Sequence, residues 1–201
     1  MCFVCEADMP RGENTPFHDN AMHYVLASTM PVERCATWFR YKKGSPYTNL
    51  VLEAKYNNRP ALARYIGYRL GAEIVCQGFF DAVDALVPVP LSTWKMMRRG
   101  FNQSAYVARG LSSHTGLPVL NLLRAREHST QTLKSAAGRR LNAGGVYRVR
   151  RQGIPPEIKH VVLVDDVITT GSTMIECIGA LKGARKDLRV SVVSAALTDG
   201  L

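Results

Sequence analysis

One segment restricts the possible folds of this chain more than any other. It starts with the unbroken apolar run HVVLV at residues 160–164 and passes through Asp165 and Asp166 into a turn of Thr, Gly and Ser. An apolar run of this kind is typical of a central parallel strand that is covered on both faces. After the turn, apolar residues recur at helical spacing, which predicts a helix. The segment therefore indicates an α/β fold in which a buried strand delivers two aspartates to its carboxyl end.

Strand and helix signals alternate along the rest of the chain, as they do in folds with a mostly parallel sheet flanked by helices. Residues 98–100 are expected to form a loop. Residues 1–31 show no clear period and are interrupted by proline and glycine, so we expect an irregular N-terminal segment at 1–31 and one domain at 32–201. The other expected strands are 33–42, 85–90, 119–123, 146–149 and 190–197, and the other expected helices are 46–56, one that starts near residue 60, and 102–114.

Composition excludes several classes of protein. The chain has 201 residues, of which 46% are hydrophobic and 21% charged, a balance typical of a globular protein and not of a disordered one. No apolar run approaches the ~18 residues of a membrane span. The first residues are too polar for a signal peptide. Five cysteines without a framework spacing argue against a disulfide scaffold, so we expect a cytoplasmic protein.

The positive charge is concentrated in residues 95–151. This block holds twelve Lys and Arg against one acid, Glu127, while the rest of the chain is close to neutral. Such a block attracts anions, which leaves phosphorylated small molecules, nucleic acid and acidic proteins as ligand classes. A solvated surface without a ligand is the alternative.

The turn at Thr169–Thr173 has the properties of a phosphate site. The first amides of a helix have no partner within the helix, and the helix end carries about half a positive charge. Gly171 lets the backbone approach a ligand closely, and the hydroxyls of Thr169, Thr170, Ser172 and Thr173 are neutral donors. The turn contains no lysine, so it is not the phosphate loop of nucleoside triphosphatases.

Two adjacent carboxylates beside a phosphate site repel each other, and a vicinal diol would account for both. Ionised aspartate only accepts hydrogen bonds, and the 2′ and 3′ hydroxyls of a ribose donate them. Asp165 and Asp166 together with the turn therefore predict a ribose 5-phosphate site, with Mg²⁺ as a shared partner of the carboxylates. The alternative is an ordinary helix cap beside two surface acids.

At this point the sequence resembles a known family. HVVLVDDVITTGSTM is similar to the signature of type I phosphoribosyltransferases, whose ligand is 5-phosphoribosyl 1-pyrophosphate (PRPP). Other segments resemble the ComF family of competence proteins within that group, and the resemblance extends over residues 32–201. These segments are GSPYTNLVLEAKY, ALVPVPL, RRGFNQS, and the pattern of Thr130, Gln131, Arg140 and Asn142.

The resemblance implies a role for each matching position. Asp165 and Asp166 would hold the ribose hydroxyls, and Thr169–Thr173 would hold the 5-phosphate. The loop after the VPVP stretch would meet the pyrophosphate, where Arg98 and Arg99 also suit phosphate oxygens because guanidinium groups pair with them bidentately.

The resemblance also implies a flexible loop at residues 126–145 that closes over the substrate, excludes water and stabilises the leaving pyrophosphate. Lys134, Arg139 and Arg140 are the candidates there, with solvated loop charges as the alternative. Lys55 belongs to a Lys-Tyr motif of the family and is a further candidate for the pyrophosphate, although a lysine at a helix end is expected in any case.

Two functions follow from these observations. The first is an enzyme that transfers a phosphoribosyl group from PRPP with release of pyrophosphate; the sequence indicates neither a general base nor the acceptor. The second is a non-catalytic competence protein that acts in DNA uptake, works with other competence proteins and contacts single-stranded DNA through the basic block. Stacking aromatic residues would support the second function, but residues 95–151 contain few of them.

The N-terminal segment contains a spacing typical of zinc ligands. Cys2, Cys5, His18 and His23 form C-x₂-C-x₁₂-H-x₄-H. The resembled family carries two Cys pairs in a small zinc ribbon, and the second pair is missing here. Prolines and a glycine interrupt the segment, so a metal-free remnant is the alternative to a zinc site.

Overall fold

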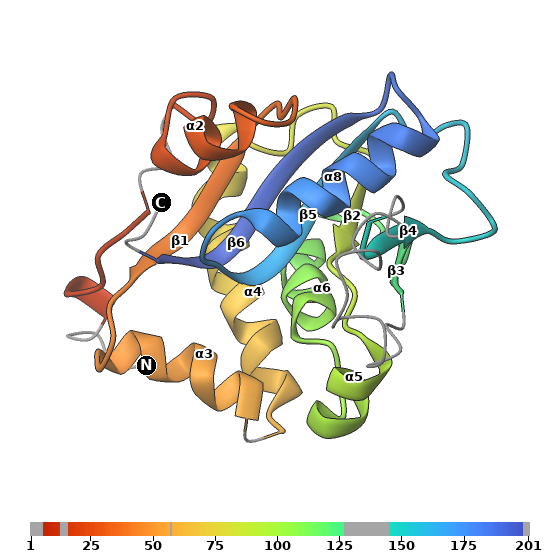
Figure 1. Cartoon of the computed structure of the whole chain (residues 1–201). Helices are drawn as coiled ribbons and strands as arrows, with labels where there is room; N and C mark the ends of the chain where they lie inside the picture. The colour runs from red at the N-terminus through yellow and green to blue at the C-terminus, as the bar shows by residue number, and fades with distance from the viewer. Residues whose placement is uncertain (1–5, 13–15, 57, 127–144, 199–201) are drawn as a thin grey trace.

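The computed structural model describes residues 6–12, 16–56, 58–126 and 145–198. Its centre is a four-stranded sheet in the order β1-β6-β5-β2, in which all three neighbouring pairs are parallel (Figure 1). The predicted parallel sheet is therefore confirmed. The strands are β1 (Cys35–Tyr41), β2 (Ala85–Pro88), β5 (His160–Ile168) and β6 (Arg189–Thr198).

Helices cover both faces of this sheet. The helices are α2 (Ala21–Ala27), α3 (Pro46–Tyr56), α4 (Pro60–Ile74), α5 (Thr93–Arg99), α6 (Gln103–Thr115) and α8 (Ser172–Ala184). Alternate residues of β5 face opposite sides: Val162 and Val164 join the core beneath α4 and α6, whereas Val161 and Leu163 join the core beneath α8 and α2. This two-sided burial explains the unbroken apolar run in the sequence.

Helices α4 and α6 pack closely against each other. A Cβ placed on Gly67 would lie 2.0 Å from the carbonyl oxygen of Val107, so no larger side chain fits there without moving a backbone. The contact fixes α6 beneath the sheet, and α6 in turn carries Ser104 to the end of β5.

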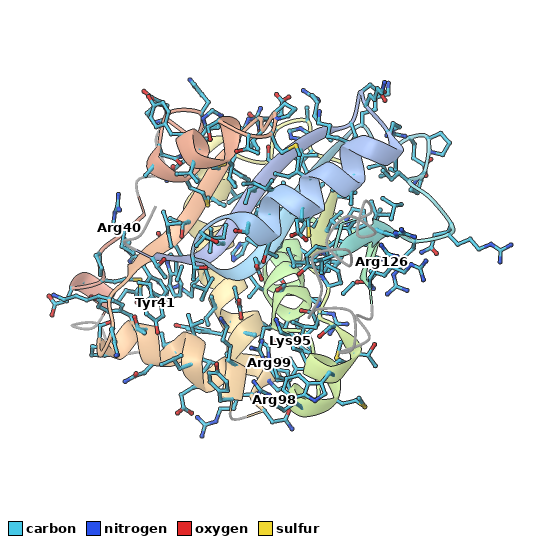
Figure 2. All side chains as sticks on the ribbon, in the orientation of Figure 1. Arg40, Tyr41, Lys95, Arg98, Arg99 and Arg126 are labelled. Carbon is cyan, nitrogen blue, oxygen red and sulfur yellow. The ribbon has the colours of Figure 1, made fainter. Side chains whose placement is uncertain are left out.

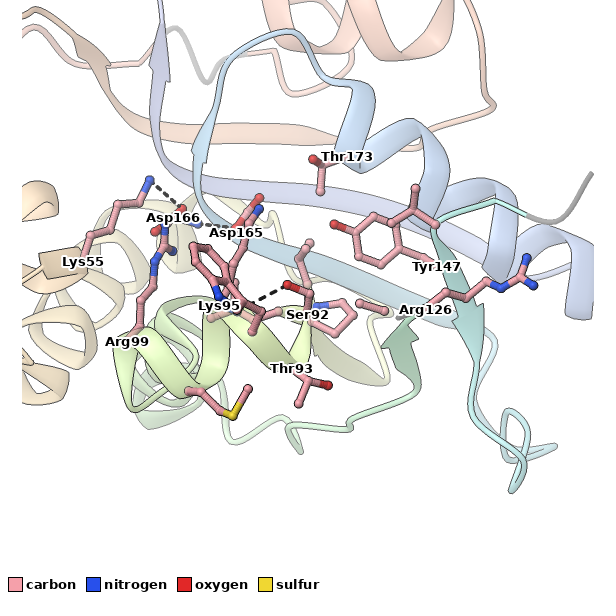
Figure 3. Close-up of a pocket in the computed structure, with 17 residues that line it drawn as sticks. Lys55, Ser92, Thr93, Lys95, Arg99, Arg126, Tyr147, Asp165, Asp166 and Thr173 are labelled. Carbon is pink, nitrogen blue, oxygen red and sulfur yellow. Dashed lines mark hydrogen bonds and ion pairs between the residues drawn. The ribbon is translucent and has the colours of Figure 1, made fainter. Parts of the chain in front are cut away.

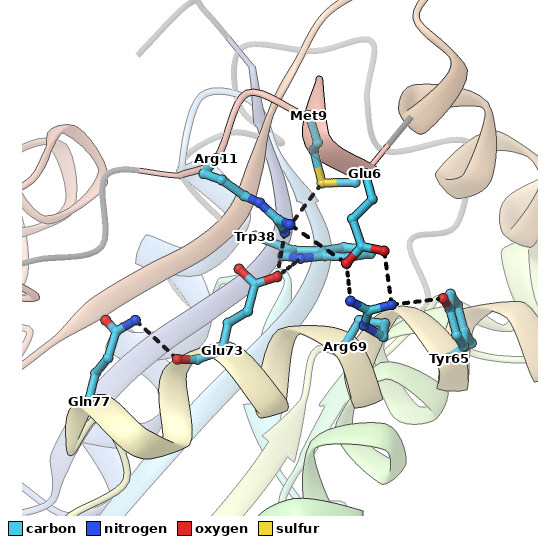
Figure 4. Close-up of polar contacts among 8 residues, drawn as sticks. All are labelled: Glu6, Met9, Arg11, Trp38, Tyr65, Arg69, Glu73 and Gln77. Atoms are coloured by element: carbon cyan, nitrogen blue, oxygen red, sulfur yellow. Dashed lines mark hydrogen bonds and ion pairs between the residues drawn. The ribbon is translucent and has the colours of Figure 1, made fainter. Parts of the chain in front are cut away.

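The N-terminal segment packs onto the domain. Residues 1–31 were expected to be irregular. This is wrong for α2, which is stabilised because Met22 and Leu26 pack into the apolar core. Figure 4 shows polar contacts that fasten the segment to α4: Glu6 pairs with Arg69, and Arg11 pairs with Glu73, which also accepts a hydrogen bond from the indole of Trp38 at 2.7 Å. The domain boundary at residue 32 stays a prediction.

Two expected elements differ from the structure. Residues 98–100 are not a loop: Arg98 and Arg99 form the last turn of α5, and Gly100 ends the helix with a φ of 76°. The expected strand at 119–123 reduces to a single bridge between Val119 and Leu86. A tight turn then redirects the chain into a separate antiparallel ribbon, β3–β4. Its strands are β3 (Leu123–Ala125) and β4 (Tyr147–Val149).

The longest helix of the described residues is α4, with 15 residues. Among these residues, no helix combines the length and the apolarity needed to cross a membrane.

Candidate active site

A cavity of about 740 Å³ opens beside the carboxyl end of β5 (Figure 3). Parallel α/β sheets bind ligands at this edge, beyond the ends of their strands. Four parts of the chain form its walls: the end of β5 with the start of α8, the segment from β2 into α5, the β3–β4 ribbon, and the last turn of α3. The polar residues of the lining are Lys55, Ser92, Thr93, Lys95, Arg99, Arg126, Tyr147, Asp165, Asp166 and Thr173.

Asp165 and Asp166 both reach this cavity, and both lie within β5, which continues to Ile168. Oδ1 of Asp165 accepts a hydrogen bond from Ser104 Oγ at 2.7 Å and one from the Asp166 amide at 2.9 Å. Oδ1 of Asp166 lies 3.2 Å from Nζ of Lys55 and accepts a hydrogen bond from the Val167 amide at 2.7 Å. Each carboxylate therefore has fixed partners on one side and faces the cavity on the other.

The two aspartates differ in their surroundings. Burial and the negative charge of Asp166 raise the pKa of Asp165, and they outweigh the hydrogen bond from Ser104 and the charge of Lys55, which act in the opposite direction. The pair therefore resists carrying two full negative charges while the cavity holds no cation or donor. A ligand that brings hydroxyl donors or a cation relieves this repulsion.

The predicted phosphate turn adjoins the aspartates. Gly171 precedes α8 with a φ of 73°, a conformation that favours glycine, and a Cβ there would lie 3.1 Å from Leu26 of α2. Thr170 and Ser172 share a hydrogen bond of 2.7 Å between their hydroxyls. A small hollow of about 30 Å³ lies inside the turn, and Asp165 and Thr173 line both this hollow and the large cavity. All five residues of Thr169–Thr173 line the hollow.

The third part of the site runs from β2 into α5. Ser92 caps α5 by accepting a hydrogen bond from the Lys95 amide, and Asn102 Nδ2 donates to the carbonyl of Val89 at 2.9 Å, which holds the loop. Arg99 lines the cavity, and its Nη1 donates to Gln103 Oε1 at 3.2 Å. Its Nε is buried, and no described residue accepts a hydrogen bond from it.

The structure separates the two predicted arginines. Arg99 lines the cavity, whereas Arg98 does not and instead stacks over the ring of Trp94, with Cζ 4.8 Å from the ring centroid. Helical geometry explains this, because consecutive residues of α5 point in different directions. Lys55, a candidate for the pyrophosphate through the family's Lys-Tyr motif, lines the cavity and is paired with Asp166.

Several lining residues were not named individually from the sequence, among them Arg126, Tyr147 and Lys95. Burial raises the pKa of Tyr147 to about 12, so its phenol stays protonated at neutral pH and presents a hydroxyl donor to the cavity. A signal for Tyr147 did exist. In the stretch Tyr147-Arg148-Val149-Arg150, apolar and basic residues alternate, which places Tyr147 on the inner face of a strand.

Several predicted site residues lie outside the described residues: Cys2, Cys5, Lys134, Arg139 and Arg140. Of the two histidines proposed for zinc, His18 is exposed, and Nε2 of His23 lies 3.2 Å from the carbonyl oxygen of Val32. Within the described part of the chain, no three His, Cys, Asp or Glu side chains gather as a metal site. The zinc site stays a prediction.

The sequence of this chain is similar to those of several known proteins. Residues 97–200 match the family described as "Phosphoribosyl transferase domain". The DNA utilization protein YhgH of Escherichia coli K12 is 32% identical over 156 residues, which cover 75% of this chain and 66% of YhgH. YhgH of Salmonella typhi is 32% identical over 161 residues, covering 74% and 70%. Competence protein F of Haemophilus influenzae is 38% identical over 95 residues, covering 46% and 42%.

The chain thus spans about two thirds of the length of the E. coli relative. Among solved structures, the allosteric regulatory enzyme of purine biosynthesis superposes with a TM-score of 0.48 at 22% identity, covering 71% of this chain and 30% of that one. Glutamine PRPP amidotransferase from B. subtilis gives the same TM-score and coverage at 23% identity.

Proposed function

The chain belongs to the phosphoribosyltransferase family, in its ComF-like branch, and on that basis we propose that its cavity binds PRPP and transfers the phosphoribosyl group to an acceptor. One observation carries this proposal. The aspartate pair and a basic wall line the large cavity, the phosphate turn lines the small hollow, and Asp165 and Thr173 line both, so that each part suits a different portion of PRPP.

The turn at Thr169–Thr173 takes the 5-phosphate. Amides at the start of α8 point outward and favour an anion, and the turn hydroxyls add donors. Asp165 and Asp166 accept hydrogen bonds from the 2′ and 3′ hydroxyls of the ribose. Lys95 and Arg99 on the opposite wall then face the pyrophosphate, where an arginine pairs well with phosphate oxygens.

Mg²⁺ fits this arrangement. Magnesium in proteins is usually held by one or two carboxylates together with substrate phosphates, and the cavity offers two carboxylates and no further ligating side chains of that kind among its described lining residues. Bound there, Mg²⁺ would neutralise charge on the pyrophosphate and on the aspartate pair.

The reaction is a substitution at C1 of the ribose. The bond from C1 to the pyrophosphate oxygen breaks, a bond from C1 to the acceptor nucleophile forms, and positive charge develops on the ring in between. The carboxylates of Asp165 and Asp166 lie at the ribose end and stabilise that charge. Arg99 and Lys95 stabilise the departing pyrophosphate. Catalysis then depends on positioning and electrostatics rather than on a covalent intermediate.

A thermal shift experiment tests the binding of PRPP. Millimolar PRPP with Mg²⁺ should raise the melting temperature of the wild type, and the double variant Asp165→Asn/Asp166→Asn should lose this shift. The matched control is Asp8→Asn/Asp187→Asn, which removes the same charge from two exposed positions and should keep it. An unchanged wild-type melting temperature would refute the ligand assignment.

Contact with single-stranded DNA is the second candidate function, and helix α5 favours it. Trp94 and Met97 are 61% and 73% exposed, and Arg98 lies over the Trp94 ring. Figure 2 shows Lys95, Arg98 and Arg99 gathered on this helix. An exposed aromatic ring among basic side chains suits the stacking of bases along a phosphate backbone. The names of the relatives, DNA utilization protein and competence protein, point the same way.

We also propose that the protein acts in the cytoplasm. The cysteines of the described residues, Cys35, Cys76 and Cys177, are all free thiols. Such cysteines are typical of a reducing compartment. Labelling the exposed thiol of Cys76 in intact and in lysed cells, with a known cytoplasmic protein as reference, tests the assignment.

A further inference from the structure

The β3–β4 ribbon carries a second concentration of charge that PRPP does not need. Its two strands are antiparallel, and Arg124 lies directly opposite Arg148. Residues in such a pair have their Cβ atoms about 4.5–5.5 Å apart, and like charges in this position destabilise a sheet. Both side chains are exposed, and within the described part of the chain no carboxylate pairs with either of them. Repulsion between the two guanidinium groups therefore destabilises the ribbon until an anion binds between them.

Strand alternation separates the two faces of the ribbon. Leu123, Tyr147 and Val149 point inward and pack with the core beneath α8. Arg124 and Arg148 share the outer face, because successive side chains of a strand point to opposite sides. The pair is therefore a surface built by two strands and not a chance meeting of loop charges.

A hollow of about 320 Å³ lies at this face. It is lined by Arg124, Ala125, Arg126 and Arg148. Its volume corresponds to about ten water molecules, which is room for a phosphate group with its hydration. Ala125 and Arg126 also line the large cavity, so the two spaces adjoin along the ribbon. Figure 3 shows Arg126 and Arg99 on opposite sides of the large cavity.

This position decides what the hollow can hold. If PRPP binds as proposed above, its 5-phosphate binds to the turn, its ribose hydroxyls bind to the aspartates, and its pyrophosphate contacts the wall formed by Lys95 and Arg99. The arginine pair lies beyond these three groups, on the ribbon. We propose that Arg124 and Arg148 form a phosphate subsite for the acceptor, and that the acceptor of this protein is a phosphate-bearing molecule.

The inference rests on the proposed function and narrows its substrate class. A phosphate group of this kind occurs in a mononucleotide and in the backbone of a nucleic acid strand. Guanidinium groups recognise the same oxygens in both cases. The two sources differ in how many contacts they offer, and a strand would extend from the ribbon towards other parts of the basic surface.

The test uses four probes: the 5′-monophosphates of the common ribonucleosides, the unphosphorylated nucleosides, a ten-residue oligo-dT, and PRPP with Mg²⁺. Calorimetric titrations compare the wild type with Arg124→Gln/Arg148→Gln. The control Arg64→Gln/Lys186→Gln removes the same charge from two other exposed positions. Nucleoside and oligonucleotide titrations are run with and without Mg²⁺-PRPP.

We expect a phosphate-bearing probe to bind the wild type and the control, and to lose at least tenfold in affinity with the ribbon variant, while PRPP binding stays unchanged. A preference for monophosphates over nucleosides identifies a mononucleotide. If oligo-dT is the only probe that binds, the ligand is a nucleic acid strand. The slope of log affinity against log salt concentration should then be smaller in the variant, by the equivalent of about two phosphate contacts.

Two results would overturn the inference. If the ribbon variant also binds PRPP more weakly than the wild type, the two arginines contact the pyrophosphate and not the acceptor. If the affinity of every phosphate-bearing probe is the same for the variant and the wild type, the subsite does not exist. Failure of PRPP to bind the wild type would instead refute the proposed function, so the two failures are distinguishable.

Discussion

The ammonium nitrogen of Lys55 lies 3.2 Å from a carboxylate oxygen of Asp166, although the two residues come from opposite halves of the chain. Both side chains are largely buried at this contact. Lys55 stands at the last turn of α3, and Asp166 stands near the end of β5. The lysine therefore neutralises one member of the aspartate pair before any ligand binds. This contact joins α3 to the candidate active site.

Replacing Lys55 should expose the repulsion between the two aspartates. We expect Lys55→Ala to lower the free energy of unfolding by about 1–3 kcal/mol, the cost of leaving a buried polar partner unpaired. The loss should be greater at pH 8 than at pH 5, because Asp165 binds a proton more readily at the lower pH. Urea denaturation at both values measures it. Lys43→Ala, at an exposed position, is the control, and an equal loss in the two variants would contradict the prediction.

The raised pKa of Asp165 predicts a specific dependence of stability on pH. Burial and Asp166 raise this pKa to about 7. The folded state thus binds more protons than the unfolded state between about pH 4 and pH 7, and stability falls as the pH rises through that window. Asp165→Asn removes this titration and still accepts hydrogen bonds through its amide oxygen.

We therefore expect Asp165→Asn to be more stable than the wild type at pH 8, by at least about 1.4 kcal/mol, the equivalent of one pKa unit. The gain should disappear near pH 4. Thermal melts of both proteins across this range give the difference directly. A gain that does not change with pH would show that Asp165 titrates normally.

Gly171 should tolerate no side chain. Its φ is 73°, and a Cβ at this position would lie 3.1 Å from Leu26, so Gly171→Ala adds backbone strain and a steric contact in the phosphate turn. Such strain costs about 1–3 kcal/mol. We expect a lower melting temperature and a weaker shift with Mg²⁺-PRPP.

Gly183→Ala provides the control in the same helix. Nothing lies within 4 Å of a Cβ at this position, and alanine has the higher helix propensity. This variant should be as stable as the wild type or more stable, with an unchanged PRPP shift. Equal behaviour of the two variants would contradict a special role of Gly171.

Trp94 should contribute to DNA contact without contributing to the fold. Its side chain is 61% exposed, and helix α5 has no buried residue. We expect Trp94→Ala to reduce affinity for fluorescent oligo-dT by about 1–3 kcal/mol per stacked base, with an unchanged melting temperature. Tyr68→Ala, at an exposed aromatic position on α4, is the control. Unchanged affinity of the Trp94 variant would remove the main argument for α5 as a DNA surface.

Local sequence was sufficient to predict the helices and strands that bury an apolar face. The run at residues 160–164 and the stripe of α8 were both identified, because two-sided and one-sided burial leave different periods. Helix α5 left no such period, since none of its side chains is buried. The signals that remained were its caps, Ser92 before it and Gly100 after it.

The residues of the candidate site also fall into those that local sequence predicts and those that it does not. Asp165, Asp166 and Thr169–Thr173 are adjacent in sequence, so one motif was enough to predict them together. Lys55 and Tyr147 join them only through tertiary packing. Arg98 and Arg99 look equivalent as sequence neighbours, and only the helical rotation between them decides that Arg99 reaches the cavity. The local sequence indicates the inner face of a strand at Tyr147 and a helix end at Lys55, but not that either side chain meets the aspartates.

Strand β1 pairs with β6, and this pairing brings Thr37 and Ser194 into contact across 157 positions of the chain. During synthesis, β1 emerges well before β6, and until β6 follows, the backbone of β1 has no partner on that side. Pairing over such a distance is slow and leaves an open strand edge in the meantime. A nascent chain of this protein is therefore exposed to aggregation between the emergence of β1 and that of β6, and chaperone contact should concentrate in that interval.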